Sequence, residues 1–164
     1  MSEENSGIQA GEHGGVVFVR VDGKGTHLNS HLLKQYLLRC LDRNSRDFQA
    51  DLSRCNYMDS TFMGMLAGIA GKVKERSLPP MKLVNPTERV REMLECLGID
   101  HLFQMVHEKR STEPLAQLSG PGINKEAKSQ EMLQAHEKLV EIAPANEARF
   151  RDVIALLREK TQKQ

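Results

Sequence analysis

Between residues 16 and 106, short strand-like runs alternate with helix-like segments, and this alternation constrains the fold more than any other feature. The strand-like runs are apolar or β-branched and fall at residues 16–21, 48–52, 81–84 and 102–106. Three segments whose apolar residues repeat at helical spacing separate them. Because parallel strands need crossover connections, and helices usually supply them, the order predicts an α/β fold with a small, mixed, mostly parallel sheet.

The second and third of these helices have recognisable beginnings. The second is predicted to start at Ser60 and to run to about residue 76. For the third, Asn85 suits the N-cap, Pro86 the first helical position, and Glu88 can complete a capping box, which together make the best local signal in the chain. The apolar face of the second helix consists of Phe62, Met65, Leu66, Ile69 and Val73.

The character of the sequence changes after the core domain, which we assign to residues 14–107. Residues 108–123 contain several Pro and Gly residues and are predicted to be a linker. Residues 124–164 hold two amphipathic patterns separated by Pro144, which predicts a C-terminal helical hairpin. The two apolar stripes are Met132, Ala135, Leu139, Val140 and Ala143, and then Phe150, Val153, Ile154 and Leu157. Each stripe needs a surface to dock on: the core domain, a second copy, or another protein.

Charge and composition argue against several classes of partner. The chain has 23 basic and 22 acidic residues, so no global field draws it to nucleic acid or anionic lipid. Residues 1–13 form a polar segment with at most one short strand and without the regions of a signal peptide. No apolar run approaches the ~20 residues of a membrane span. We therefore expect a cytoplasmic protein without direct contact to nucleic acid or membrane.

The three cysteines point in the same direction. Cys40, Cys55 and Cys96 are odd in number, far apart in the sequence, and outside any CxxC pair. We expect them to be buried, reduced thiols of the core. No flanking sequence supports a catalytic cysteine.

Signatures of enzymes and of metal or cofactor sites are missing from the sequence. Gly23-Lys24-Gly25 follows a strand, but Leu28 stands where a dinucleotide-binding fingerprint needs its third Gly. No phosphate-binding GxxxxGK[ST] loop and no GxSxG elbow is present. His27 and His31 are four residues apart, and no further ligands accompany them. We predict a protein that is not an enzyme, with no catalytic residues, metal or cofactor of its own.

The turn Asp59-Ser60-Thr61 between a strand and the second helix is the strongest candidate site. Asp, Ser and Thr are preferred at helix N-caps, where they stabilise a helix by roughly 1 kcal/mol, so a structural role alone would explain them. However, sites in open sheets lie at the carboxyl ends of strands, and a helix N-terminus accommodates a phosphate group. Phosphorylation of Ser60 would add nearly two negative charges beside Asp59 and would change a binding surface.

Three glycines on one face of the second helix give this site a second feature. Gly64, Gly68 and Gly71 are spaced by four and three residues, and each costs about 1 kcal/mol relative to Ala inside a helix. They indicate close approach by another backbone. Packing on the protein's own sheet and docking of a partner helix beside Ser60 are equally compatible with the pattern.

The motifs of this region resemble a known family. They are Asp51-Leu52-Ser53, Tyr57-Met58-Asp59-Ser60-Thr61 with Gly64, Leu83-Val84-Asn85-Pro86, and Leu94 with Gly98-Ile99. Together, over about residues 14–107, they resemble the STAS domain of bacterial anti-sigma factor antagonists and sulfate transporters. The resemblance implies a small sheet with helices on one face, and it is closer to the soluble antagonists.

The resemblance also implies a mechanism of partner switching in transcription regulation and signal transduction. A serine kinase that also serves as anti-sigma factor would bind the unphosphorylated protein and phosphorylate the hydroxyl after the Asp, which is Ser60 here. Thr61 is the alternative acceptor. A metal-dependent serine phosphatase would reset the phosphoprotein, and ATP would belong to the kinase. The implied partner-binding residues are Asp59, Ser60, Thr61, Phe62, Met63, Gly64 and Gly68.

Two other functions remain open at the level of sequence. The domain is also compatible with a constitutive scaffold or oligomerisation module that acts through the C-terminal helices, including a homodimer. Some STAS-like domains bind nucleotides or lipids, as the resemblance implies, so a small-ligand-binding domain is the third alternative. The resemblance does not explain the hairpin, and Phe62-Met63 makes the turn bulkier than is usual in the family.

Overall fold

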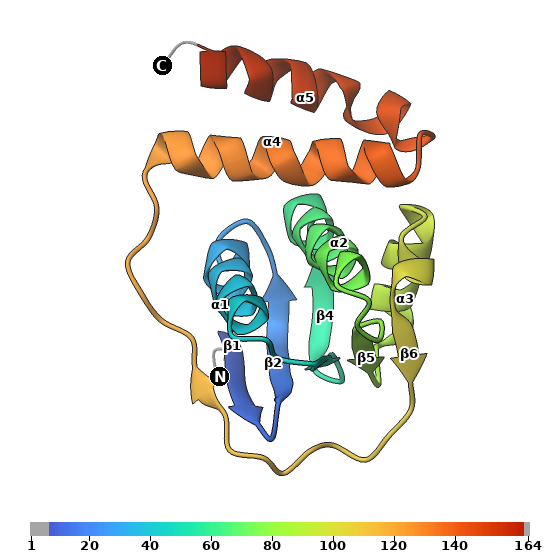
Figure 1. The fold of residues 1–164 in the computed structure, drawn as a ribbon. Coiled ribbons are helices and arrows are strands. Elements are labelled where there is room, and N and C mark those ends of the chain that lie inside the picture. The colour runs from blue at the N-terminus through green and yellow to red at the C-terminus, as the bar shows by residue number, and fades with distance from the viewer. Residues whose placement is uncertain (1–6, 163–164) are drawn as a thin grey trace, which may run out of the picture.

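The computed structural model describes residues 7–162 of the chain (Figure 1). Residues 1–6 of the predicted N-terminal segment and residues 163–164 of the predicted hairpin lie outside the described residues. Three helices cover one face of a central sheet, and two further helices lie across the end of this layer (Figure 1). The predicted α/β class is therefore confirmed, including the helices on one face and the C-terminal hairpin.

The sheet is mixed and mostly parallel. Its order is β6-β5-β3-β2-β1-β7, and β4 pairs with β2 beyond this path. The β2–β3, β2–β4, β3–β5 and β5–β6 pairs are parallel, whereas β1 pairs antiparallel with β2 and with β7. The strands are β1 (Gly7–His13), β2 (Val16–Gly25), β3 (Asp47–Asp51), β4 (Cys55–Met58), β5 (Lys82–Val84), β6 (Gln104–Val106) and β7 (Ala116–Gln117).

Three of these strands, β1, β4 and β7, lie outside the four runs predicted from sequence. β1 pairs along its full length with β2, from Gly7 opposite Asp22 to His13 opposite Val16. The polar and Gly-rich composition of this stretch weakens the strand signal, but alternate residues such as Ile8 and Ala10 are buried. β4 is only four residues long, and it ends one residue before Asp59.

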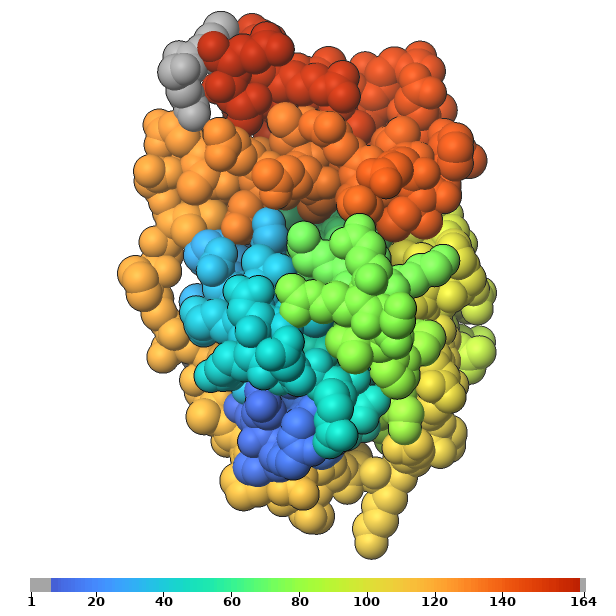
Figure 2. Space-filling model, viewed as in Figure 1, coloured from blue at the N-terminus to red at the C-terminus, as the bar shows by residue number. Residues whose placement is uncertain are grey.

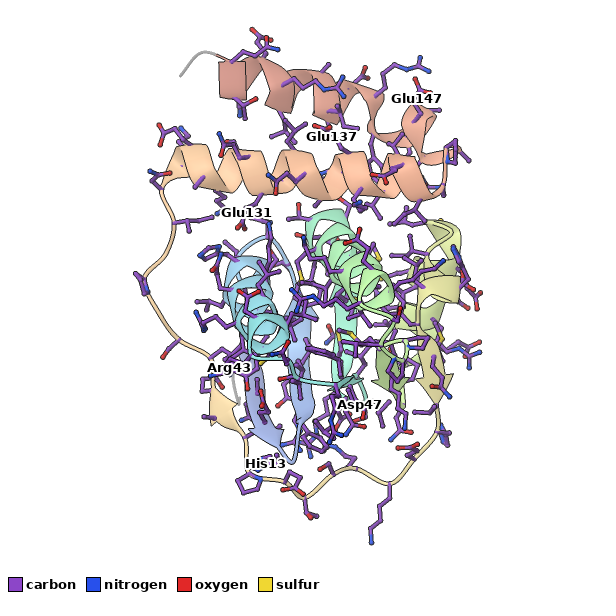
Figure 3. All side chains as sticks on the ribbon, viewed as in Figure 1. His13, Arg43, Asp47, Glu131, Glu137 and Glu147 are labelled. Carbon is purple, nitrogen blue, oxygen red and sulfur yellow. The ribbon has the colours of Figure 1, made fainter. Side chains whose placement is uncertain are left out.

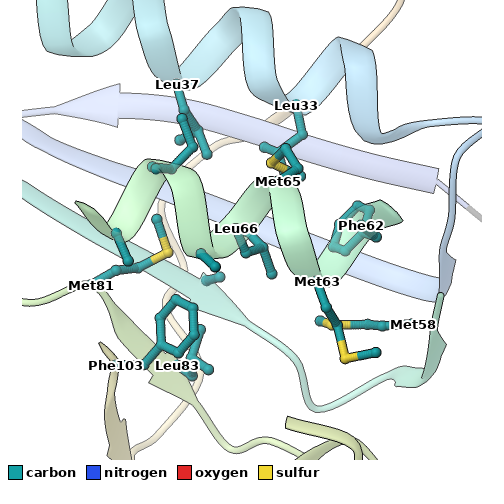
Figure 4. Close-up of a cluster of buried hydrophobic side chains, with 14 of the residues drawn as sticks. Leu33, Leu37, Met58, Phe62, Met63, Met65, Leu66, Met81, Leu83 and Phe103 are labelled. Atoms are coloured by element: carbon teal, nitrogen blue, oxygen red, sulfur yellow. The ribbon is translucent and has the colours of Figure 1, made fainter. Parts of the chain in front are cut away.

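The crossover helices form as their apolar spacing predicts. They are α1 (Ser30–Asp42), α2 (Ser60–Glu75) and α3 (Glu88–Cys96), followed by a 3₁₀ turn at Asp100–Leu102. The apolar face predicted for α2 is buried in full. Figure 4 shows Met65 of α2 on the side of this helix that faces Leu33 and Leu37 of α1. Met63, on the opposite side of α2, lies beside Met58. Burial of this face, worth about 1.5–3 kcal/mol for each large side chain, fixes α2 on the sheet.

The predicted start of α3 was wrong by two residues. Thr87, not Asn85, is the N-cap, and its side chain accepts a hydrogen bond from the Val90 amide. Asn85 has a left-handed φ of 51°, which Asn tolerates better than most residues. Its side-chain amide donates to the Glu108 carbonyl oxygen at 2.6 Å and accepts from the Glu108 amide at 3.0 Å. Asn85 therefore connects the end of β5 to the residues after β6 and is not available as a cap.

The segment after β6 crosses the face of the sheet opposite the helices. Arg110 donates from Nε to Asp51 Oδ2 at 2.7 Å, and β7 adds to β1 through Ala116 and Gln117. A Cβ at Gly11 would lie 2.9 Å from the Pro114 carbonyl oxygen and 3.2 Å from the Leu115 side chain. Part of the predicted linker is thus held on the core sheet.

The C-terminal hairpin consists of α4 (Lys125–Ile142) and α5 (Asn146–Gln162). α4 crosses one end of α1, α2 and α3, and α5 lies on its outer side (Figures 1 and 2). Asn146 is buried between them, and its amide donates to the Leu97 and Leu139 carbonyl oxygens at 2.9 Å each. Of the predicted stripes, Ala135, Leu139, Phe150, Ile154 and Leu157 are buried, whereas Val153 is 41% exposed.

Two further expectations concern the whole chain. Cys40 and Cys55 are buried free thiols, but the prediction of a buried thiol was wrong for Cys96, which is exposed at the end of α3. Cys96 lies on the polar side of that short helix, where Arg149 of α5 donates to its sulfur at 3.1 Å. None of the described helices is long and apolar enough to span a membrane.

Candidate functional site

Asp59 connects the end of β4 to the start of α2 and makes contacts with both sides of the turn. Its Oδ1 accepts from the Phe62 amide at 2.8 Å, which is the N-cap bond that the sequence predicts. Its Oδ2 accepts from the His27 amide at 2.8 Å and lies 3.1 Å from His27 Nδ1. The Asp59 amide in turn donates to the Gly25 carbonyl oxygen at 2.9 Å. The carboxylate therefore fixes α2 against the end of β2.

Ser60, the first residue of α2, contacts a residue far away in the sequence. Its Oγ lies 2.8 Å from Nε2 of His136, which belongs to α4. The other ring nitrogen of His136, Nδ1, lies 2.6 Å from the carbonyl oxygen of Met132. A carbonyl oxygen can only accept, so Nδ1 carries a proton. In the neutral imidazole Nε2 is then the acceptor, and the Ser60 hydroxyl donates to it.

The environment of His136 holds the ring in this position. Its side chain is 3% exposed, and the Phe150 ring of α5 packs edge-on against it with centroids 5.0 Å apart. Because both ring nitrogens have a partner, burial leaves neither of them unsatisfied. His136 thus joins the start of α2 to both helices of the hairpin.

The proposed partner-binding residues lie together, but most of them are covered. Asp59 and Ser60 are half-buried, whereas Thr61, Phe62, Met63 and Gly64 are buried. Phe62 and Met63 belong to the core of the domain, and a Cβ at Gly25 would lie only 2.6 Å from the Phe62 ring. Thr61 is 5% exposed, which makes Ser60 the more accessible of the two hydroxyls.

The three glycines of α2 do not share one neighbour. A Cβ at Gly64 would lie 2.7 Å from the carbonyl carbon of Ala135 and 2.8 Å from its Cβ, so the backbone of α4 approaches α2 at this residue. At Gly68 and Gly71 a Cβ would meet nothing within 4 Å. The backbone that approaches Gly64 therefore belongs to this chain's own C-terminal helix, which neither expectation from sequence had named.

Beyond Gly64 the two helices diverge and leave a groove of about 340 Å³. Gly68 and Gly71 border it on the α2 side, and Lys138 and Glu141 border it on the α4 side. Both Lys and Glu side chains line this groove, so its charge favours neither an anion nor a cation.

Polar contacts hold the first half of α4 on α1. His31 Nδ1 lies 2.9 Å from Glu131 Oε1, and Lys34 Nζ lies 3.8 Å from the same oxygen. Lys34 also donates to Gln134 Oε1 at 3.3 Å. Figure 3 shows Glu131 on the side of α4 that faces α1, and Glu137 between α4 and α5. These half-buried pairs set the position of α4 above the Ser60 turn.

A second polar cluster lies on the opposite face of the sheet. Burial by itself would raise the pKa of the Asp51 carboxyl group, but two hydrogen bonds from Ser53 and one from Arg110 outweigh it. The pKa of Asp51 is therefore below its ordinary value. The cluster attaches the segment after β6 to β3 and has a structural role.

Nothing in the described part of the chain forms a metal site of three or more His, Cys, Asp or Glu side chains. The Ser60–His136 pair has the spacing of a nucleophile and its base. However, Ser60 is not among the residues that line the groove between α2 and α4, and the base is enclosed by the hairpin.

His136 is the site residue that sequence reasoning missed. It lies one turn after Met132 and one turn before Leu139, in register with the apolar stripe of α4. A titratable residue within an apolar stripe is the signal that singles it out. The signal names no partner, because Ser60 is 76 residues away in the sequence.

Comparisons with known proteins agree with this architecture. A family model described as the STAS domain matches residues 7–112. A putative anti-sigma factor antagonist of Thermotoga maritima superimposes with a TM-score of 0.54 and 20% identity, over 61% of this chain and 85% of that one. The unphosphorylated anti-sigma factor antagonist SpoIIAA gives 0.56 and 17%, over 62% and 88%.

A third similar structure is the Bacillus cell fate determinant SpoIIAA in its phosphorylated form. It superimposes with a TM-score of 0.53 and 16% identity, over 62% of this chain and 91% of that one. Among curated proteins, none matches the sequence. At these identities the structural matches establish the fold, and the family match covers well over half of the chain.

Proposed function

The chain belongs to the STAS domain family, and from this premise we propose that it is a partner-switching protein of the anti-sigma factor antagonist type. In this proposal Ser60 is phosphorylated reversibly by a serine kinase that also acts as an anti-sigma factor. The unphosphorylated protein binds that kinase through the turn and the first part of α2. The protein is a substrate and a regulator, and catalysis belongs to its partners.

One observation carries the proposal: a half-buried serine hydroxyl stands at the first residue of a helix, directly after a capping aspartate and a sheet strand. The amide groups and the positive dipole end of such a helix stabilise a phosphate. Thr61 is the weaker candidate acceptor because it is buried. One of the similar structures is of a phosphorylated protein, and this supports phosphorylation as the proposed regulation.

The proposed reaction is a phosphoryl transfer whose catalytic parts lie in the kinase. The Ser60 Oγ–H bond breaks and an Oγ–P bond forms with the γ-phosphorus of ATP. The bond from that phosphorus to the β–γ bridging oxygen breaks, and ADP leaves. The hydroxyl proton passes to a base of the kinase. A metal-dependent serine phosphatase reverses the modification by adding water across the Oγ–P bond, which returns Ser60 and inorganic phosphate.

A phosphate-transfer assay tests this function. The full chain is incubated with ATP and an extract of its own cells, and the peptide 55–72 is analysed by mass spectrometry. We expect phosphate on Ser60 in the wild type, none in Ser60→Ala, and unchanged labelling in Thr61→Val. Labelling of Ser60→Ala but not of Thr61→Val would move the acceptor to Thr61, and absence of label in every variant would contradict the proposal.

A homodimer through the hairpin stays a separate proposal. Most of the apolar stripes of α4 and α5 are buried within the chain, and Val153 and Leu156 are the large exposed apolar residues on α5. A dimer of this kind would have to use these two side chains. Sedimentation of Val153→Ser/Leu156→Ser beside the wild type tests it: a lower mass in the double variant alone would support a dimer, and equal masses would reject it.

A further inference from the structure

The C-terminal hairpin occupies the surface that the proposed function assigns to a partner. α4 places the Ala135 backbone against Gly64 and the His136 ring against Ser60. Thr61 and Met63, which lie between Ser60 and Gly64 in the sequence, are 5% and 6% exposed. A kinase that needs the Ser60 hydroxyl and the first turns of α2 would meet α4 there.

We infer that the face of α2 around Ser60 and Gly64 is a helix-docking surface that α4 occupies in place of a helix of the partner, so that the hairpin and the partner exclude each other. This inference rests on the proposed function and names the regulation of its site. The protein then has a closed state, with α4 docked, and an open state, which binds the kinase only while Ser60 is unphosphorylated.

The chemistry of the surface defines the partner's helix. The partner's helix must carry a small residue opposite Gly64, as α4 carries Ala135. The reason is that the only space at this point is the space left by the missing Cβ of Gly64. Opposite Ser60 it must offer a hydrogen-bond acceptor for the hydroxyl, as Nε2 of His136 does. We therefore expect a helix with Ala, Gly or Ser followed by a polar residue, flanked by apolar side chains.

Phosphorylation of Ser60 is incompatible with the closed state. The phosphoester oxygen has no proton to donate to Nε2, and a phosphate cannot fit in a 2.8 Å gap between Oγ and the ring. His136 cannot retreat, because the Met132 carbonyl oxygen and the Phe150 ring enclose it. The Asp59 carboxylate on the other side of the turn adds repulsion. The phosphate must therefore expel α4 from α2.

Competition with the tethered α4 determines how strongly the closed state lowers the affinity for a partner helix. Residues 119–124 connect the part of the segment that is held on the core sheet to α4, so α4 acts at a high effective concentration, in the millimolar range for short flexible connections. The apparent affinity for a partner helix is reduced because only the open fraction of molecules can bind it. Variants that open the hairpin without changing α2 should therefore bind a helix added in trans at least about tenfold more tightly.

Hydrogen exchange of the full chain tests the phosphate-driven opening. Phosphoserine is installed at position 60 by amber suppression, and at position 119, in an exposed part of the linker, as a matched control. We expect amides of residues 125–142 to exchange at least tenfold faster in the first protein and at the wild-type rate in the second. Unchanged exchange with phosphoserine 60 would overturn the inference.

Glycine substitutions test the docking contact independently of phosphate. Gly64→Ala should open α4 by the backbone clash with Ala135, whereas Gly68→Ala, with open space around its new Cβ, should leave α4 protected. Equal protection in the two variants would contradict the close contact on which the inference depends.

A helix in trans tests the docking surface itself. A fluorescent peptide of residues 124–162 serves as the probe, added to the full-length wild type, to Ala135→Leu, and to Ala148→Leu, an exposed control on α5. Ala135→Leu loosens the chain's own hairpin but keeps α2 intact, so it should bind the peptide at least tenfold more tightly than the other two proteins. Equal binding by all three would reject the docking surface.

These outcomes are separate from those of the proposed function. If Ser60 is never phosphorylated in cells, the partner-switching function fails, yet installed phosphoserine still opens the hairpin. If Ser60 is phosphorylated but the hairpin stays docked, the function stands and the inference fails.

Discussion

Nε2 of His136 lies 2.8 Å from Oγ of Ser60, and this contact joins the C-terminal hairpin to the helix start that carries the candidate phosphorylation site. The ring is buried and its tautomer is fixed by the Met132 carbonyl oxygen. Ser60 is therefore both the candidate switch residue and a structural partner of α4. This dual role makes its substitutions informative.

Replacing the hydroxyl should cost stability without unfolding the protein. In Ser60→Ala the buried Nε2 atom of His136 loses its donor, and we expect a loss of about 1–2 kcal/mol in the free energy of unfolding. Urea denaturation followed by circular dichroism measures it. Ser119→Ala, an exposed control, should stay within about 0.5 kcal/mol of the wild type. Equal stability of the two variants would show that the Ser60–His136 bond contributes nothing.

The cap and the switch can be separated at Asp59. Asp59→Ala removes the acceptor of the Phe62 amide and should lower stability by about 1–2 kcal/mol. Asp59→Asn keeps an oxygen for that amide and should cost less than half as much in thermal or urea unfolding. If both variants lose the same stability, the charge and its contact with His27 matter more than the cap.

The two glycine substitutions should have opposite effects on stability. Gly64→Ala forces a Cβ into the α4 backbone and should destabilise the chain by about 1–3 kcal/mol. Gly68→Ala gains helix propensity in open space and should stabilise it by up to about 1 kcal/mol. Urea midpoints measured side by side give the sign of each. A stabilising Gly64→Ala would contradict the observed approach of Ala135.

Asp51 should make stability fall in acid. Its pKa is lower in the folded than in the unfolded chain, so its contribution is complete above the unfolded value of about 4 and is lost as the pH falls through the folded value. Asp51→Asn should be about 1–3 kcal/mol less stable at pH 7 and show a smaller loss between pH 5 and pH 3. Parallel pH dependences of the two proteins would exclude Asp51 as a source of acid sensitivity.

The cysteines should differ in reactivity. Burial raises the pKa of the Cys40 and Cys55 thiols, which reduces the thiolate available at neutral pH, whereas Cys96 is exposed. A maleimide at pH 7 should label Cys96 at least about tenfold faster than the other two, as read by peptide mass spectrometry. Similar rates for all three would mean that the core opens readily.

The sequence predicted the fold of the central domain because its signals are local. The spacing of Phe62, Met65 and Ile69 places one face of α2 on the sheet, and that face is buried as expected. β4 was harder to identify, because four residues with only Cys55 and Met58 buried give too short an alternation. The cap at Thr87 was missed because Asn85, an equally good capping residue, is used by Glu108 instead.

The candidate site was only partly predictable for a different reason. Asp59 and Ser60 are adjacent, so their roles as cap and first helical residue follow from local preferences. The contact of Ser60 with His136 and of Gly64 with Ala135 depends on where an amphipathic hairpin docks, and helical periodicity gives a face but no partner. Only the folded chain shows that the hairpin covers the proposed partner-binding surface.

The most direct test of a switch at Ser60 is its phosphate occupancy in the protein purified from its own cells. Intact-mass and peptide mass spectrometry across growth and stress conditions measure it. We predict a fraction of molecules about 80 Da heavier, with the phosphate on Ser60, and a fraction that changes with condition. An unmodified Ser60 under every condition would contradict the central claim and leave the Asp59-Ser60 turn as a helix start alone.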